Sequence, residues 1–85
     1  MRPLEYEPVF SAKAWEVLLA CSKRRQMRIA RLAYVLADFP FRVGDYQTPD
    51  ATGRMLENLR MEGFVFTYWP DHASRELRIV DLIEL

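Results

Sequence analysis

The chain has 85 residues, of which 51% are hydrophobic and 28% charged, and its formal net charge is zero. This length provides one domain with one modest core, and it excludes a second domain or a deeply enclosed active site. The composition is that of a globular protein rather than a disordered one, and the neutral total argues against strong nonspecific binding of polyanions.

Charge is nevertheless distributed unevenly along the chain. Residues 1–43 hold eight Lys and Arg against four Asp and Glu, whereas residues 44–85 hold four against eight. The first half is therefore +4 and the second −4. Such a separation can attract an anion on one side and a basic partner on the other. A nucleic-acid site would therefore have to be formed by a local group of basic residues, because the net charge of the chain does not indicate one.

The cysteine content and the amino terminus favour the cytoplasm. Cys21 is the only cysteine, so an intrachain disulfide or a thiolate metal cluster is excluded, and its apolar neighbours indicate a small buried side chain. The first ten residues lack a basic region followed by an apolar one, and no apolar run reaches the roughly 18 residues that span a bilayer. We expect a cytoplasmic protein without a membrane segment.

The first half of the sequence predicts a short strand and two helices. Tyr6–Phe10 is extended, and Pro8 suits the edge of a sheet because proline has no backbone donor. Ser11 has the properties of a helix N-cap, and apolar residues recur at helical spacing over residues 12–21. Ser22 marks a break before a second helix over residues 23–37.

The second predicted helix carries a basic stripe beside an apolar one. Arg24, Arg28 and Arg31 follow at i, i+4 and i+7 and therefore share one side. Guanidinium groups match phosphate and carboxylate oxygens, so this stripe can bind nucleic acid or an acidic protein partner. A solvated helix face is the alternative interpretation, because a run of charge alone is weak support for a site.

The second half predicts a loop followed by three strands. Residues 41–53 are rich in turn-forming residues, and we expect an irregular loop that is the first place to look for an interface. Strands are then predicted over residues 55–61, 64–69 and 75–85, with a tight turn at Glu62 and Gly63.

The final predicted strand has an interrupted apolar face. Leu77, Ile79, Ile83 and Leu85 are expected on one face, and Asp81 predicts a bulge or the end of pairing near it. Taken together, the elements predict an α+β fold of order β-α-α-β-β-β, in which two N-terminal helices pack on a small antiparallel sheet in a single domain, residues 1–85.

Few residues suit acid–base or metal chemistry. His72 is the sole histidine and follows Asp71, and a carboxylate that orients an imidazole can make it a general base. Turn chemistry is the plainer interpretation, since neighbours in a turn seldom present their side chains to each other. One histidine with scattered aspartates lacks any known metal-ligand spacing, so we predict neither a metal nor a cofactor.

Two adjacent aromatic residues in the middle strand offer a second kind of site. Tyr68 and Trp69 point to opposite faces, so one belongs to the core and the other can be exposed. An exposed ring beside Arg54, Arg60 or Arg78 would form a stacking platform for a base or a partner side chain. Core packing of both rings is the alternative.

The chain resembles the RelE/ParE superfamily of type II toxin–antitoxin toxins over nearly its whole length. The resemblance rests on VFSAKAWEVLL leading into two helices, on AYVLADFPFRVGDY, on FTY in the middle strand and on the apolar final strand RELRIVDLIEL. It implies a bacterial toxin that an antitoxin neutralises, and that either cleaves messenger RNA on the ribosome as an endoribonuclease or poisons DNA gyrase. Val65 stands where a family ribonuclease tends to have arginine.

The resemblance also implies roles for particular residues. Phosphate stabilisation or proton transfer during cleavage would fall to Arg54, Arg60, Arg78, Tyr68 and His72. Antitoxin or phosphate binding would fall to Arg24, Arg28, Arg31 and Trp69. Two alternatives stay open: a non-catalytic protein-binding module similar to a gyrase inhibitor, and a scaffold that has lost its chemistry. A homodimer formed through a sheet edge is a further expectation.

Overall fold

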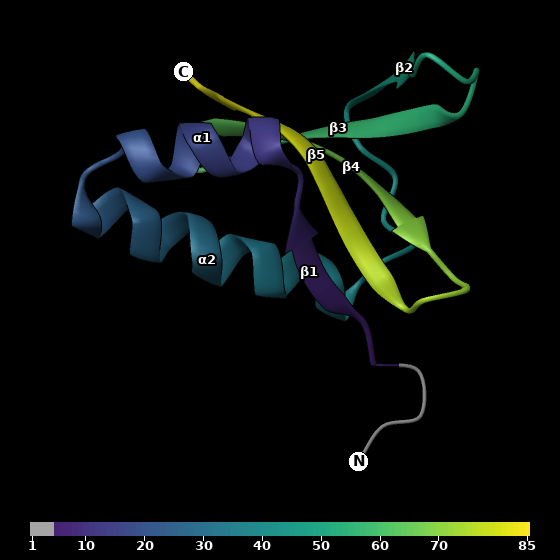
Figure 1. Ribbon diagram of the computed structural model, residues 1–85, viewed down its shortest axis with the longest axis horizontal. Helices are drawn as coiled ribbons and strands as arrows, with labels where there is room; N and C mark the ends of the chain where they lie inside the picture. The colour runs from purple at the N-terminus through teal and green to yellow at the C-terminus, as the bar shows by residue number, and fades with distance from the viewer. Residues whose placement is uncertain (1–4) are drawn as a thin grey trace.

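The computed structural model describes residues 5–85 and confirms the predicted α+β class (Figure 1). Residues 1–4 of the predicted domain lie outside the described part. A five-stranded sheet has the strand order β1-β5-β4-β3-β2. The elements in chain order are β1 (Glu7–Phe10), α1 (Ala12–Ala20), α2 (Lys23–Asp38), β2 (Tyr46–Pro49), β3 (Met55–Met61), β4 (Phe64–Asp71) and β5 (Glu76–Glu84).

The sheet is mixed rather than antiparallel, which corrects one part of the prediction. β1 pairs with β5 in parallel, with Glu7 opposite Glu76 and Phe10 opposite Ile79, whereas the other three pairings are antiparallel. Parallel neighbours need a long crossover connection. The two helices and the three strands between β1 and β5 provide it.

A strand occupies part of the segment that was predicted to be an irregular loop. Tyr46–Pro49 forms β2 and pairs with β3, with Tyr46 opposite Asn58. Propensity misses this strand because prolines, glycines and aspartates surround it and because its pairing partner lies further along the chain. The Gly44 amide and the Asp45 amide hold the preceding residues against β3, donating to Glu57 Oε1 (2.7 Å) and to the Asn58 carbonyl (2.7 Å).

Both helices begin at serine caps; the sequence predicted the cap at Ser11, and for Ser22 it predicted only a break. The Ser11 hydroxyl accepts from the Ala14 amide at 3.1 Å, and the Ser22 hydroxyl accepts from the Arg25 amide at 3.3 Å. Ser22 therefore caps α2 at the break that follows α1. Neither helix within residues 5–85 combines the length and the apolar character needed to cross a membrane.

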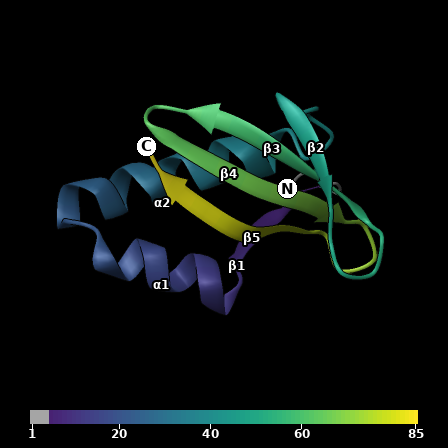
Figure 2. The same cartoon turned by 90° about the horizontal axis from the view of Figure 1, so that it is seen from above.

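The core lies between the helices and one face of the sheet. Figure 2 shows both helices on one side of the sheet, with the other side uncovered. Phe64, Phe66 and Tyr68 of β4 point toward the helices and are almost completely buried. Ile29 and Leu36 of α2 belong to the same core cluster and have no exposed surface. We call the uncovered side the open face.

A bulge in β5 changes the side of the sheet to which the later side chains of that strand point. Thr67 is opposite Asp81 but Tyr68 is opposite Ile79, so Val80 is an extra residue in β5. The sequence predicted this bulge near Asp81. It also changes which residues face the helices, because one inserted residue exchanges the two faces of a strand.

The predicted single apolar face of β5 is therefore wrong beyond the bulge. Leu77 and Ile79 before it are fully buried, as expected, and Leu82 after it is also buried. Ile83 and Leu85 instead point to the open face, where 47% and 64% of their surfaces are exposed. The sequence predicted the bulge, but it kept these two side chains on the face of Leu77 and Ile79 because the exchange of faces after an inserted residue was not applied to them.

Ser11 joins the start of α1 to this bulge. Besides capping the helix, its hydroxyl donates to the Val80 carbonyl at 2.8 Å. We expect Ser11→Ala to lower the free energy of unfolding by about 1–3 kcal/mol, since it removes both a cap and a second hydrogen bond. Urea denaturation followed by circular dichroism measures this. Ser22→Ala is the matched control, because Ser22 caps α2 without reaching another element, and we expect it to cost about 1 kcal/mol or less. Equal losses for the two variants would show that the bond to Val80 contributes nothing.

Candidate functional site

The candidate site lies at one end of the open face and centres on Trp69 in β4. Its ring is half-buried, while Tyr68 next to it is fully buried on the opposite face. Arg54 Cζ lies 3.7 Å from the centroid of the Trp69 ring, and Arg78 Cζ lies 5.9 Å from it. Both separations are within the range of cation–π attraction. We call these three residues the Trp69 site.

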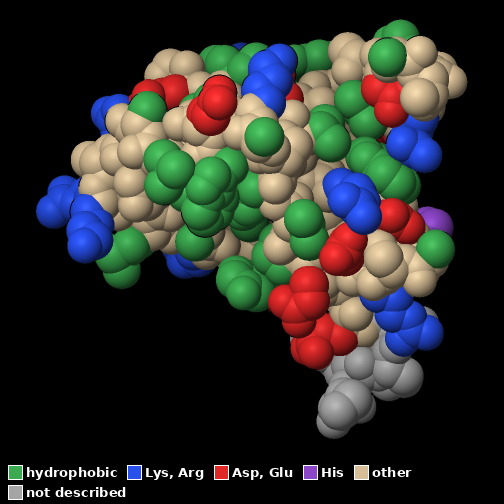
Figure 3. All heavy atoms as spheres, in the orientation of Figure 1, with side chains coloured by type: hydrophobic (Ala, Val, Ile, Leu, Met, Phe, Trp, Pro, Cys, Tyr) green, Lys and Arg blue, Asp and Glu red, His purple; other side chains and the backbone are tan. Residues whose placement is uncertain are grey.

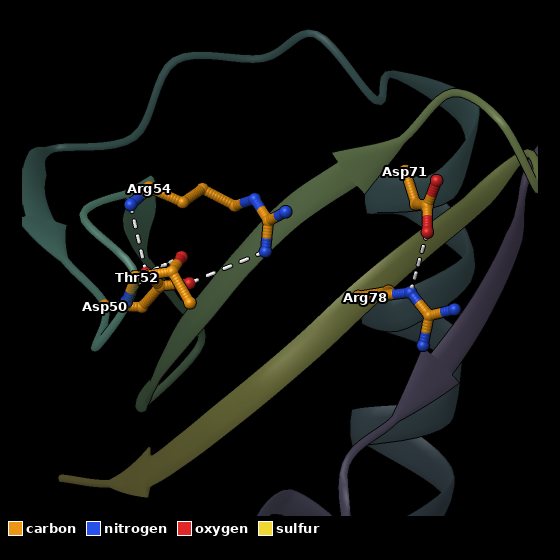
Figure 4. A network of polar contacts seen from close by, with 5 residues as sticks. All are labelled: Asp50, Thr52, Arg54, Asp71 and Arg78. Atoms are coloured by element: carbon orange, nitrogen blue, oxygen red, sulfur yellow. Dashed lines mark hydrogen bonds and ion pairs between the residues drawn. The ribbon is translucent and has the colours of Figure 1, made fainter.

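Arg54 reaches Trp69 from a turn that Asp50 organises. The Asp50 Oδ1 atom accepts from the Thr52 amide (2.8 Å), the Thr52 hydroxyl (2.7 Å) and the Arg54 amide (3.0 Å). Its Oδ2 atom lies 3.5 Å from Arg54 Nη1. These bonds to the ionised form, with the Thr52 hydroxyl first, lower the pKa of Asp50. Figure 4 shows the Arg54 side chain extending from this turn across the sheet.

Arg78 is held from the other side by two acidic residues at the β4–β5 turn. Its Nε atom donates to Asp71 Oδ2 at 3.0 Å, and its Nη2 atom lies 2.8 Å from Glu76 Oε1 (Figure 4 shows the bond to Asp71). The bond from Arg78 is the main cause that lowers the pKa of Asp71. Both arginines are thus placed by carboxylates that stay ionised at neutral pH.

The Trp69 site can bind a planar, negatively charged ligand. The Arg54 guanidinium lies over one face of the indole ring, so a nucleobase would stack on this guanidinium or replace it on the ring. The two arginines can then contact the phosphates of the same strand. The ion pairs that hold the arginines are solvent-exposed, with 46% of the Arg54 side chain and 40% of the Arg78 side chain accessible. Exposed pairs of this kind are weak, so a phosphate can displace Asp50 or Asp71.

Tyr68 lies away from this site although it is adjacent in sequence. Its ring is in the core, and its hydroxyl donates to the Arg42 carbonyl at 2.8 Å. Burial, with a smaller effect from the charge of Glu57, raises the pKa of Tyr68 to about 12. The phenol therefore keeps its proton at neutral pH and faces the helix side, and the geometry does not favour it as a proton donor at Trp69.

The pKa of Tyr68 predicts a loss of stability in alkali. Below the ordinary pKa of 10.0 the phenol is neutral in both the folded and the unfolded chain. Between pH 10 and about 12 the unfolded chain releases the proton while the folded chain retains it, so the free energy of unfolding falls. We expect Tyr68→Phe to reduce the decline between pH 9 and 11.5 in urea denaturation, at a fixed cost of about 1 kcal/mol for the lost hydrogen bond. Tyr34→Phe, at an exposed position on α2, is the control and should leave the slope unchanged. If the free energy of unfolding fell equally with pH in the unaltered chain, Tyr68→Phe and Tyr34→Phe, the raised pKa could not belong to Tyr68.

His72 lies in the β4–β5 turn and is engaged elsewhere. Its Nδ1 atom and the Tyr6 hydroxyl share a hydrogen bond of 2.6 Å, and its ring stacks on Phe41 with centroids 5.0 Å apart. Asp71, the predicted orienting carboxylate, bonds to Arg78 instead. His72 therefore ties together three segments of the chain, and the predicted pairing of Asp71 with His72 is not formed.

Arg60 lies on the open face at a distance from Trp69. It is opposite Val65 in β4, whereas the Trp69 site is at the other end of that strand. Its amide donates to Asp45 Oδ2 at 2.9 Å. Of the three arginines predicted to stabilise phosphate, two therefore converge on Trp69 and the third does not.

The basic stripe on α2 is partly neutralised within the chain. Glu62 in the β3–β4 turn lies 2.9 Å from Arg31 Nη2 and 3.9 Å from Arg28 Nε. Arg24 forms no ion pair with any of residues 5–85. Figure 3 shows Lys and Arg side chains gathered at the end of the molecule where α1 leads into α2. The stripe is thus a surface with one unpaired arginine rather than three.

Sequence reasoning missed the carboxylates that place the two arginines. Asp50 is four residues before Arg54 within a turn, a spacing that could have indicated the contact, but Asp71 meets Arg78 only because β4 and β5 pair across their turn. Among residues 5–85 there is no group of three His, Cys, Asp or Glu side chains that could hold a metal ion.

The sequence matches no protein-family model and no curated protein. Its structure is similar to a chain of the toxin–antitoxin complex RelBE2 from Mycobacterium tuberculosis, with a TM-score of 0.74 and 18% identity, over 95% of this chain and 99% of that one. It is also similar to a chain of the archaeal RelE–RelB complex from Pyrococcus horikoshii, with a TM-score of 0.66 and 14% identity, over 94% of each chain. The protein therefore has the fold of the RelE toxins, as the resemblance in its sequence implied.

Proposed function

We propose that this chain is the toxin of a bacterial type II toxin–antitoxin pair, acting in the cytoplasm and neutralised by an antitoxin protein. The observation that carries the proposal is the similarity of the whole chain to chains of two toxin–antitoxin complexes. A fold can host several functions, so the proposal also depends on the Trp69 site. An indole between two arginines on an open sheet face suits contact with single-stranded messenger RNA on the ribosome.

A second candidate is a toxin that acts by binding a protein such as DNA gyrase, without cleaving RNA. One feature favours it: the groups nearest Trp69 are poor at transferring protons. Asp50 and Asp71 have lowered pKa values, and Tyr68 points into the core. A general acid or base works best with a pKa near the pH of the cell. The Trp69 site thus provides binding more clearly than it provides cleavage.

The experiment that tests the proposal is tightly controlled induction of the chain in a bacterium, with pulse labelling of protein and DNA synthesis. We expect growth to stop. Protein synthesis that fails first would support action on ribosome-bound messenger RNA, and primer extension would then show whether the message is cut. DNA synthesis that fails first would support the gyrase alternative. Unchanged growth at a verified level of folded chain would overturn the toxin proposal.

A further inference from the structure

A hollow lies on the open face, at the opposite end of β4 from Trp69. It has a volume of about 570 Å³ and is lined by Asp45, Tyr46, Arg60, Val65, Ile83 and Leu85. Val65 forms a buried floor, and the three larger apolar side chains around it, Tyr46, Ile83 and Leu85, are 50%, 47% and 64% exposed. We call this surface the Ile83 hollow.

The β5 bulge is the reason that this hollow is apolar. Without the extra residue Val80, the alternation of β5 would turn Ile83 toward the helices. The hydroxyl of Ser11 holds Val80 from the start of α1, so the outward position of Ile83 is built into the fold. Neighbouring exposed apolar side chains on a small protein commonly mark an interaction surface.

The charges in the hollow are self-complementary. Arg60 forms no ion pair with any of residues 5–85, and Asp45 uses one carboxylate oxygen to accept the Arg60 amide. One cation and one anion therefore lie beside the same apolar patch. A two-fold axis through such a patch would place Arg60 of each copy near Asp45 of the other and would pack the apolar side chains on their counterparts.

We propose that the Ile83 hollow is the contact between two copies of this chain in a symmetric dimer. The sheet edges suit self-association less well, because the edge strands β1 and β2 contain Pro8 and Pro49, which remove backbone donors. Six residues line the hollow, whereas a stable interface uses about 20–30 residues on each side, so the dimer is weak and forms as the concentration rises.

The dimer leaves the Trp69 site accessible. Val65 and Trp69 are four residues apart in β4, which places them about 13 Å from each other along the strand. Each copy therefore keeps its own Trp69 site outside the contact. The inference goes beyond the proposed toxin function, and it would stand whether or not the chain halts growth.

Sedimentation velocity of the full chain over about a hundredfold range of concentration tests the dimer. We expect the mass to rise from the monomer value of 10.1 kDa toward twice that value. Leu85→Glu and Ile83→Thr should each weaken association at least about tenfold, because they remove apolar contact from the hollow. Val43→Glu, at a position that is 70% exposed and outside the hollow, should not change it.

A charge exchange tests the predicted pairing of Arg60 with Asp45. Arg60→Asp and Asp45→Arg should each weaken the dimer, and the two together should restore it, because the charges across the axis are again opposite. A chain that is monomeric up to about 1 mM would overturn the proposal. So would a dimer that Leu85→Glu and Ile83→Thr leave intact while both variants retain the circular dichroism spectrum of the parent, since another surface would then form it.

Discussion

Trp69→Ala should restore growth in cells where the unaltered chain halts it. Stacking of a base or a partner side chain on an aromatic ring contributes about 1–3 kcal/mol, so we expect binding to the target to weaken roughly 5- to 150-fold. The ring also supports the two arginines, and without it Arg54 and Arg78 lose the surface that positions them. Growth after induction, with the amount of folded chain measured in the same cultures, gives the result.

The chain provides a matched control for this prediction in its other tryptophan. Trp15 lies on the outer side of α1, is 49% exposed and contacts Phe10 edge-to-face, so Trp15→Ala removes a ring of the same kind away from the Trp69 site. We expect Trp15→Ala to remain toxic. If both variants halt growth as the parent does, the Trp69 site is not the functional surface, although the toxin proposal would survive.

Phe66→Ala is expected to produce the largest loss of stability. Phe66 is fully buried in the middle of β4 and packs against Phe64, with ring centroids 6.4 Å apart. Removing a buried phenylalanine ring costs about 3–5 kcal/mol, while a domain of this length has about 4–13 kcal/mol in total. The Tm should therefore fall by at least about 12 °C, as thermal unfolding followed by circular dichroism would show.

Phe39→Ala makes the same chemical change at a surface position. The Phe39 ring is 57% exposed, and it contacts Arg42, whose Cζ lies 5.3 Å from the ring centroid. The expected loss is below about 1 kcal/mol. Losses of equal size at the two positions would mean that the core does not lie between β4 and the helices.

The sequence predicted most elements because their signals are local. Ser11 identifies the start of the first helix from its cap chemistry, and Ser22 marks the break before the second. Glu62 and Gly63 form the predicted turn, with positive φ values of 48° and 88°. β2 was missed because its identity depends on pairing with β3. The predicted faces of Ile83 and Leu85 were wrong because the bulge expected near Asp81 exchanges the faces of all residues after it, and the prediction of one shared apolar face did not include that exchange.

The candidate site was predictable to a similar extent. Tyr68 and Trp69 alternate on a strand, so the sequence could place one in the core and the other beside an arginine. It could not select among the arginines, because that depends on which strands are neighbours and on their register. The pairing of β4 with β5 puts Arg78 opposite Trp69, whereas the pairing of β3 with β4 puts Arg60 opposite Val65.

The parallel pairing of β1 with β5 determines when this protein can fold during its synthesis. The first strand has no partner until the last one leaves the ribosome, and the Ser11 cap lacks its Val80 acceptor until then. Contacts between the ends of a chain close long loops and form late. A nascent chain can assemble α1, α2 and the β2–β4 meander, but its sheet stays open at β4 until β5 is available. The complete sheet therefore forms only after β5 has been synthesised, and a truncation before Glu76 should yield no folded protein.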